Sequence, residues 1–147
     1  MSVDISALGI KVTIRATPSY PAGITLTKFA DDGDSINVPE MTIMSHGMGV
    51  NGDMVVWRTA VPCVLDVNLI PGTDDCKKME NLFKLNMTQK NKNASKDVLV
   101  ATIEHPDGRV DVLSNGYIEA GKPIQDYSSS GRAKSRAFRM VFENNVN

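Results

Sequence analysis

The sequence predicts a mainly β protein, a barrel or sandwich of about eight antiparallel strands with one flanking α-helix and a long projecting hairpin. Most apolar segments alternate with polar residues at a period of two, as strands do when they bury one face. Residues 74–87 instead carry apolar side chains at three- and four-residue spacing, as in an amphipathic helix. Because strand patterns lie on both sides of this segment, we expect a single domain, residues 1–147, in which the helix lies against a β-structure.

Length and charge narrow the classes of function. The 147 residues suit one domain with its own core, and the net charge of -1 gives no general attraction to nucleic acid or to anionic membranes. No apolar run approaches the ~20 residues that cross a bilayer, and the first residues lack the pattern of a signal peptide. We expect synthesis in a cytoplasm and no contact with a membrane.

The first 60 residues read as short strands separated by turns. The expected elements are a strand at 10–15, a turn-rich stretch at 17–23, a strand at 24–27, a turn at 31–34 and an extended stretch at 36–44. Asn51 and Gly52 then form a strong hairpin signal. This signal predicts one long hairpin over residues 41–59, with arms at 41–44 and 54–57.

The segment 61–87 has the clearest pattern in the chain. Its strand places alternate residues on one face, namely Cys63, Leu65, Val67 and Leu69. Pro71 and Gly72 end this strand, because proline has no amide hydrogen to donate and glycine permits a sharp reversal. Thr73 is the expected helix cap, and the apolar helix face holds Cys76, Met79, Leu82, Phe83 and Met87. Two inward-facing cysteines favour reduced core thiols over a disulfide.

The last third of the chain returns to strands. We expect a loop at 88–96, strands at 98–104 and 109–113 joined by a turn at 106–108, a short strand at 117–118, a flexible segment at 125–131 and a closing strand around 138–142. The closing strand alternates apolar Phe138, Met140 and Phe142 with polar neighbours. The alternation with one polar face argues against a parallel, doubly wound sheet.

The sequence nominates no catalytic, cofactor or metal site. His46 and His105 have no second histidine or cysteine at ligand spacing, and two cysteines are too few for a structural metal. The acidic turn at 31–34 lacks the closing glutamate of a calcium loop, and the glycine pattern at 47–52 precedes a strand rather than a helix. The serines at 128–130 have no histidine near them in the sequence. We expect no cofactor and no enzymatic activity.

The one concentrated group of charges is the basic cluster Arg132, Lys134, Arg136 and Arg139. Such a cluster contacts phosphates if it lines a groove, and otherwise marks a solvated strand edge. Phe138 and Phe142 fall on the core-facing register, so the aromatic side chains that stack on bases are absent here. We therefore favour a solvated strand edge.

The predicted hairpin is the candidate interaction site. Its apolar length exceeds what one small core needs, and methionines fill irregular gaps between subunits well. Trp57 fits two roles, an exposed interface anchor or a core residue. The candidate subunit-interface residues are Met41, Met44, His46, Met48, Val50, Met54 and Trp57. The alternative interpretation is a pair of ordinary core strands with a floppy tip.

Three parts of the chain together resemble the tail-tube proteins of contractile-tailed bacteriophages and related secretion tubes. They are the hairpin at 41–59, the strand and turn Val61-Pro62-Cys63-Val64-Leu65-Asp66-Val67-Asn68-Leu69-Ile70-Pro71-Gly72-Thr73-Asp74-Asp75, and the helix to Met87. The opening residues 1–10 and the turn at 31–34 look like the tube-like baseplate members of the same group. The likeness covers most of the chain.

This resemblance implies a structural virion protein that forms a hexameric, tube-like ring in a contractile phage tail. The implied partners are other copies of the chain, other tail-tube and baseplate-hub proteins and sheath-associated proteins, while DNA passes through the lumen without specific binding. Long polar loops at 88–96 and 122–132 favour the baseplate end, and the alternative role is the major repeating tube subunit. The implied location is the phage tail.

Two other classes of function remain as alternatives. A β-sandwich that binds a ligand on one face usually presents several Trp and Tyr side chains, but Trp57 stands alone here and Tyr20, Tyr117 and Tyr127 lie in or near loops. An enzyme needs convergent polar groups, and the sequence shows none.

Overall fold

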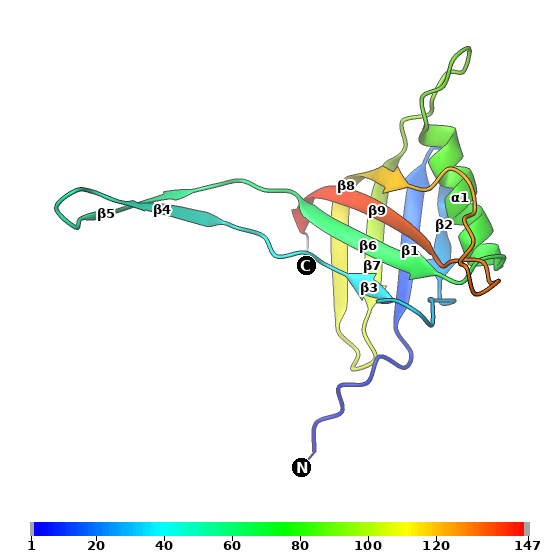
Figure 1. Cartoon of the computed structure of the whole chain (residues 1–147), viewed down its shortest axis with the longest axis horizontal. Coiled ribbons are helices and arrows are strands. Elements are labelled where there is room, and N and C mark those ends of the chain that lie inside the picture. The colour runs from blue at the N-terminus through cyan, green and yellow to red at the C-terminus, as the bar shows by residue number, and fades with distance from the viewer. Residues whose placement is uncertain (1, 146–147) are drawn as a thin grey trace.

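The computed structural model describes residues 2–145, which form nine strands and one helix (Figure 1). The elements are β1 (Lys11–Thr17), β2 (Tyr20–Leu26), β3 (Ile36–Asn37), β4 (Met44–Met48), β5 (Met54–Arg58), β6 (Cys63–Leu69), α1 (Asp74–Asn86), β7 (Val98–Glu104), β8 (Val110–Gly121) and β9 (Arg136–Asn145). The predicted class, mainly β with a single helix, is confirmed.

Among these residues, seven strands form one antiparallel sheet in the order β2-β1-β7-β8-β9-β6-β3, and β4 pairs with β5 separately. The sheet curls, because the segment that follows β2 reaches the far side and bonds to the end of β6. The Ile70 amide donates to the Lys28 carbonyl at 3.0 Å, and the Ala30 amide donates to the Asn68 carbonyl at 3.0 Å. These two bonds bring opposite ends of the sheet together, which makes the fold barrel-like.

The core lies inside this curled sheet, and α1 packs against β2 and β8 (Figure 1). The alternation read from the sequence holds in β1, β6, β7 and β9, whose buried residues include Val12, Ile14, Leu65, Val67, Leu99, Phe138, Met140 and Phe142. Cys63 and Cys76 are buried and free, as expected. The pKa of the Cys76 thiol is raised to about 11, mainly by burial and next by the nearby Glu80 carboxylate. This thiol therefore stays neutral.

Helix α1 begins where its cap was predicted. The Thr73 hydroxyl accepts the Cys76 amide at 3.4 Å. Asp75 in the first turn accepts two further amides, from Thr27 at 2.9 Å and Lys28 at 3.1 Å, and so ties the helix to the end of β2. The helix ends at Asn86, one residue before the predicted end, because Met87 is extended. No helix within residues 2–145 has the length and apolar character needed to cross a membrane.

A buried carboxylate joins three elements at the other end of α1. Asp97, 1% exposed, accepts the Ser19 amide at 3.0 Å, the Ser19 hydroxyl at 2.8 Å and the Asn86 side-chain amide at 2.8 Å. Its own backbone amide donates to Oδ1 of the Asn86 side chain at 2.9 Å. Burial alone would raise the pKa of Asp97, but the hydrogen bonds from Ser19 and Asn86 outweigh it and hold the pKa below its ordinary value.

Replacing this carboxylate should cost stability in a pH-dependent way. In Asp97→Asn the new amide group faces other donors, so we expect the free energy of unfolding at pH 7 to fall by about 2 kcal/mol. Because the folded-state pKa is lowered, the wild-type contribution is present above the unfolded-state pKa of ~3.9 and disappears as the pH falls through the folded-state value. Urea unfolding between pH 7 and pH 3 should therefore show the gap between wild type and variant closing in acid.

The matched control for this measurement is Asp53→Asn, on the exposed turn between β4 and β5. We expect its free energy of unfolding to stay within about 0.5 kcal/mol of wild type at every pH. A gap between wild type and Asp97→Asn that persists unchanged at pH 3 would contradict the role given to the ionised carboxylate.

Two predicted boundaries were wrong for identifiable reasons. The turn-rich stretch 17–23 is shorter than expected, because β2 already begins at Tyr20. The strands predicted at 109–113 and 117–118 are one continuous strand, β8. Its register shifts by one residue between Leu113 and Gly116, where Asn115 has a φ of 57°. This β-bulge absorbs the extra residue and lets the strand continue through a stretch that looked like a break.

Candidate assembly interface

The β4–β5 hairpin projects from the barrel as a separate arm (Figure 1). Its strands pair in register from Met44 opposite Arg58 to Met48 opposite Met54. Its turn is closed by two backbone bonds, from the Gly49 amide to the Asp53 carbonyl at 2.7 Å and from the Gly52 amide to the Gly49 carbonyl at 2.9 Å. The hairpin was predicted correctly, but the bounds of its first arm, 41–44, were wrong. Strand β4 begins at Met44, where the predicted arm ended, and continues through Gly47 to Met48.

All seven residues predicted for the interface are exposed, and six of them are large apolar side chains. Trp57 is 52% exposed, so its role as a core residue is excluded. Sequence reasoning missed three further exposed apolar residues of the arm, Ile43, Val55 and Val56. The run of β-branched residues beside Trp57 was the available signal. None of these residues belongs to the core cluster, so the barrel is complete without them.

Both faces of the hairpin are apolar. Residues that stand opposite each other in an antiparallel pair share a face. One face therefore carries Met44, Met48, Met54 and Val56, with His46 opposite Val56 and Arg58 opposite Met44. The other face carries Val55 and Trp57 opposite Gly47 and Ser45, and the Trp57 ring lies 3.8 Å from the place where a Gly47 Cβ would stand. A β-ribbon lying on a single surface would need only one apolar face, so this pattern favours burial on both sides.

The N-terminal segment, residues 2–9, is a second exposed apolar feature that sequence reasoning missed. It precedes β1 without helix or strand and ends in a turn at residues 8–9. Val3, Ile5 and Leu8 are between 85% and 92% exposed. A hollow of about 560 Å³ separates this segment from the β7–β8 turn, with His105 and Arg109 on the turn side. Apolar and polar residues alternate from Val3 to Ala7, but this pattern covers too few residues to stand out in the sequence.

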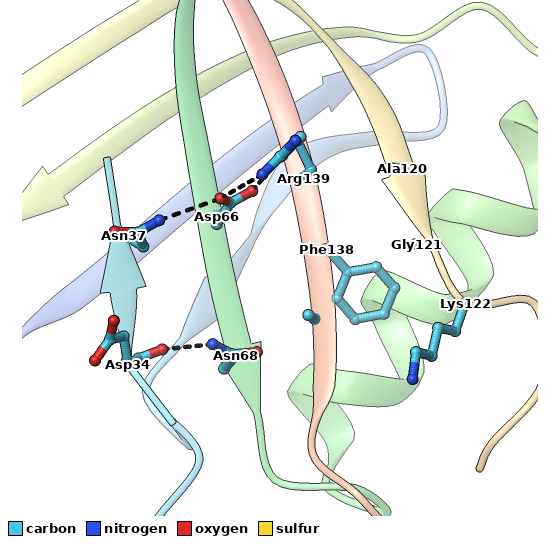
Figure 2. A pocket seen from close by; sticks show the side chains of 10 residues that line it. Asp34, Asn37, Asp66, Asn68, Ala120, Gly121, Lys122, Phe138 and Arg139 are labelled. Atoms are coloured by element: carbon cyan, nitrogen blue, oxygen red, sulfur yellow. Dashed lines mark hydrogen bonds and ion pairs between the residues drawn. The ribbon is translucent and has the colours of Figure 1, made fainter. Parts of the chain in front are cut away.

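A shallow polar groove of about 420 Å³ lies over β3, β6 and β9 (Figure 2). Arg139 holds Asp66 through two bonds, from Nε at 2.8 Å and from Nη2 at 3.1 Å, and this guanidinium keeps the pKa of Asp66 below its ordinary value. The Asn68 side chain donates to the Asp34 carbonyl at 2.7 Å. The one aromatic residue among the ten that line the groove, Phe138, is buried. The groove therefore offers no aromatic surface on which a sugar ring would stack.

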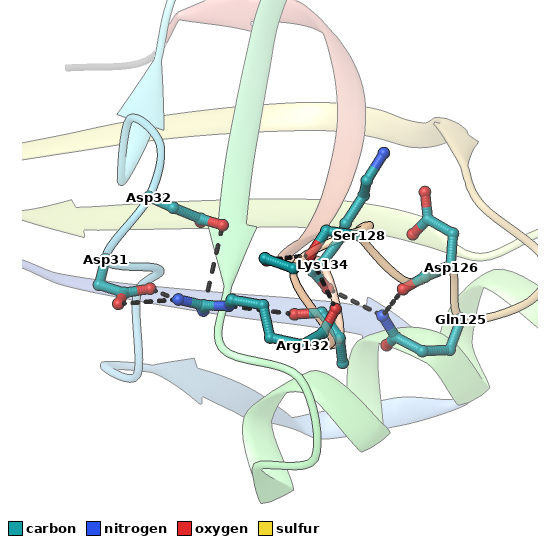
Figure 3. A network of polar contacts seen from close by, with 9 residues as sticks. Asp31, Asp32, Gln125, Asp126, Ser128, Arg132 and Lys134 are labelled. Atoms are coloured by element: carbon teal, nitrogen blue, oxygen red, sulfur yellow. Dashed lines mark hydrogen bonds and ion pairs between the residues drawn. The ribbon is translucent and has the colours of Figure 1, made fainter.

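The three arginines of the basic cluster pair with acidic side chains, and Figure 3 shows the first of them, Arg132. Arg132 donates to both carboxylate oxygens of Asp31, at 3.0 and 3.3 Å, and lies 4.0 Å from Asp32. The guanidinium lowers the pKa of Asp31. Gln125 donates to the Lys134 carbonyl at 2.8 Å, which closes the loop between β8 and β9 on itself. The loop predicted to be flexible is thus held by ion pairs and hydrogen bonds.

The interpretation of this cluster as a solvated strand edge was wrong. Strand β9 lies inside the sheet between β8 and β6, because its partners come from distant parts of the chain. Arg136 is 2% exposed, its Nε lies 3.5 Å from Glu80 Oε1, and its Nη2 donates to the Lys122 carbonyl at 2.7 Å. Arg139 is paired with Asp66. These contacts connect β9 to α1, to the residue after β8 and to β6. Because both arginines are paired, they offer little positive charge for binding phosphates.

The two histidines lie apart from each other. His46 is on the exposed hairpin, and His105 Nε2 is 2.6 Å from Asp111 Oδ2 beside the β7–β8 turn. Within residues 2–145, no three His, Cys, Asp or Glu side chains gather in the way that holds a metal ion.

Comparison with known proteins finds one matching family model and several solved structures of similar fold. The family of tail fiber protein gp32 matches residues 3–146. Of solved structures, a chain of the anti-feeding prophage baseplate, determined with six-fold symmetry, has a TM-score of 0.56 at 10% identity, with 99% of this chain and 96% of that chain covered. A chain of an extracellular contractile injection system, the PVC sheath–tube complex in its extended state, has a TM-score of 0.53 at 9% identity, with 98% and 92% covered.

No curated protein matches the sequence. The two structural likenesses share the fold at low identity, whereas the family match spans nearly the whole chain. The chain therefore belongs to the tail fiber protein gp32 family and is a phage tail-type protein.

Proposed function

We propose that this protein is a structural, non-enzymatic tail component that assembles into a closed, tube-like ring of six copies. The observation that carries the proposal is the β4–β5 hairpin, which presents apolar side chains on both faces outside a completed core. Exposed apolar patches of this kind mark interaction sites in soluble proteins. In a closed ring each copy makes the same contact with the next, so one arm per copy suffices.

The total exposed surface supports the proposal. The chain exposes 9732 Å², whereas a compact protein of 16.0 kDa exposes about 7,400 Å². The excess of roughly 2,300 Å² lies in the range that obligate subunit interfaces bury. A chain with this much extra surface has the shape of a subunit whose arms are covered in an assembly.

The proposed place is the baseplate end of a contractile phage tail, where the ring joins the tube to the hub and surrounding proteins. The likeness to a chain of a six-fold symmetrised baseplate supports the ring number and the position. The likeness to a chain of a sheath–tube complex supports the second candidate, the repeating tube subunit, with sheath-associated partners. In either role DNA passes through the lumen without specific binding, which agrees with the paired arginines of β9.

The first test is the mass of the purified protein by light scattering, with negative-stain images of the same sample at low and high concentration. We expect a hexamer of about 96 kDa, six times the 16.0 kDa chain, seen as rings. Stacked tubes would favour the repeating tube subunit over the baseplate ring. A protein that stays monomeric at high concentration and also fails to co-purify with tail proteins would overturn the proposal.

A further inference from the structure

We propose that the N-terminal segment of one copy, residues 2–8, adds to the β4–β5 hairpin of a neighbouring copy as a third strand along β5. This inference rests on the proposed assembly of identical chains and names a contact within it. Figure 1 shows the hairpin and the N-terminus leaving the barrel in different directions, so each is available to another copy.

The N-terminal segment has the pattern of a strand without a partner. Val3, Ile5 and Ala7 alternate with Asp4 and Ser6 at a period of two. The bonds formed by residues 2–8 are local, from the Ser6 amide to Asp4 Oδ1 at 2.9 Å and from the Ile10 amide to the Ala7 carbonyl at 3.2 Å. A sheet edge elsewhere would satisfy its amides and carbonyls and bury its apolar face.

The β4–β5 hairpin has open strand edges that could accept such a segment. Among residues 2–145, β4 and β5 pair with each other alone, so each leaves one edge of its backbone open. An isolated two-stranded hairpin is marginally stable in water, and a third strand with an apolar face is the smallest addition that changes this. Adding residues 2–8 would supply backbone partners and apolar cover together.

Strand β5 is the edge best suited to accept a strand. Strand β2, at one end of the main sheet, contains Pro21 and Gly23, and β3, at the other end, has two residues. Strand β4 contains Gly47. Proline and very short strands protect edges against pairing, whereas β5 reads Met-Val-Val-Trp-Arg without proline or glycine.

Charge and side-chain size indicate the register. An antiparallel pairing that sets Asp4 opposite Arg58 places Ile5 opposite Trp57 and Ser6 opposite Val56. Opposite charges and aromatic with β-branched residues are favourable cross-strand pairs. In this register Val3, Ile5 and Ala7 lie on the face of β5 that carries Val55 and Trp57.

Disulfide trapping tests the register in the assembled full-length protein. In Ser6→Cys with Val56→Cys, the two introduced thiols face each other, and mild oxidation should link neighbouring copies into a ladder that reaches the covalent hexamer on a non-reducing gel. The matched control is Ser6→Cys with Val55→Cys, whose second thiol points to the opposite face of β5; we expect at least tenfold less cross-linking. Each single variant reports any linkage through the buried Cys63 or Cys76.

The outcomes separate this contact from the proposed function. Rings that form by light scattering but give no more cross-linking than the control pair overturn the third-strand contact and leave the ring standing. A cross-linked monomer, identified by its faster migration, shows pairing within one chain and also overturns it. If the wild-type chain forms no ring, alone or with tail proteins, the proposed function and this inference fail together.

A second variant tests the apolar side chains without introducing thiols. In Val3→Ser with Ile5→Ser, we expect the concentration at which rings half-dissociate to rise at least tenfold, with the thermal unfolding of the monomer unchanged. Unchanged ring stability in this variant would count against the contact even if the cross-link formed.

Discussion

Gly116→Ala should lower the free energy of unfolding by about 3 kcal/mol or more, a large share of the 5–15 kcal/mol that holds a domain together. Gly116 lies in β8 directly opposite Phe142 of β9 and is buried. A Cβ at this position would stand 2.5 Å from Cε1 of the Phe142 ring and 2.8 Å from the Val141 carbonyl oxygen. The ring fills the core and the carbonyl belongs to a sheet ladder, so neither can move without cost. Guanidinium unfolding of both proteins measures the difference.

A matched glycine separates this clash from a general effect of alanine. At Gly33, on the exposed turn before β3, a Cβ would meet the Asn68 side chain at an ordinary 3.5 Å. We expect Gly33→Ala to stay within about 0.5 kcal/mol of wild type. Phe142→Leu combined with Gly116→Ala should cost less than the sum of the two single changes, because the smaller side chain relieves part of the clash. An additive result would contradict the steric explanation.

Polar substitution of either hairpin face should disrupt assembly without affecting the fold. Met48→Thr with Met54→Thr changes one face, and Val55→Thr with Trp57→Thr changes the other, while threonine keeps the strand propensity. If both faces are buried between subunits, each pair removes about 3 kcal/mol or more of contact energy, and rings should half-dissociate at a concentration at least 100-fold higher. Light scattering over a dilution series measures this concentration.

The barrel itself should not respond to these changes, because the hairpin lies outside the core. We expect the melting temperature of the monomer to change by no more than about 2 °C. Val110→Thr is the control, since Val110 is also exposed and apolar but lies on β8 away from the hairpin; its rings should keep their stability. Should one face tolerate threonine as well as Val110 does, the hairpin would be covered on one side alone.

Local patterns explain how much of the site could be predicted. The hairpin signal at Asn51-Gly52 and the apolar residues around it pointed to the arm, because turn chemistry and apolar composition can be read over a few adjacent residues. The alternation of apolar and polar residues within β5 fails, since Val55, Val56 and Trp57 follow one another. This run of consecutive apolar residues was the sequence feature that indicated two apolar faces. The N-terminal residues were missed, because the alternation of Val3, Ile5 and Ala7 with polar residues covers only the shortest stretch that indicates a strand.

The sequence by itself determined the class of the fold, the single helix with its Thr73 cap, and the buried face of each long strand, because these depend on backbone propensities and on periodicity over adjacent residues. The tertiary structure alone decided the strand order, which places β9 and its arginines inside the sheet, and the β-bulge that joins two predicted strands into β8. It also decided that the hairpin stands outside the core. These features depend on contacts between residues far apart in the chain, such as Arg136 with Glu80 and Gly116 with Phe142, and no local pattern encodes which distant partner a strand meets.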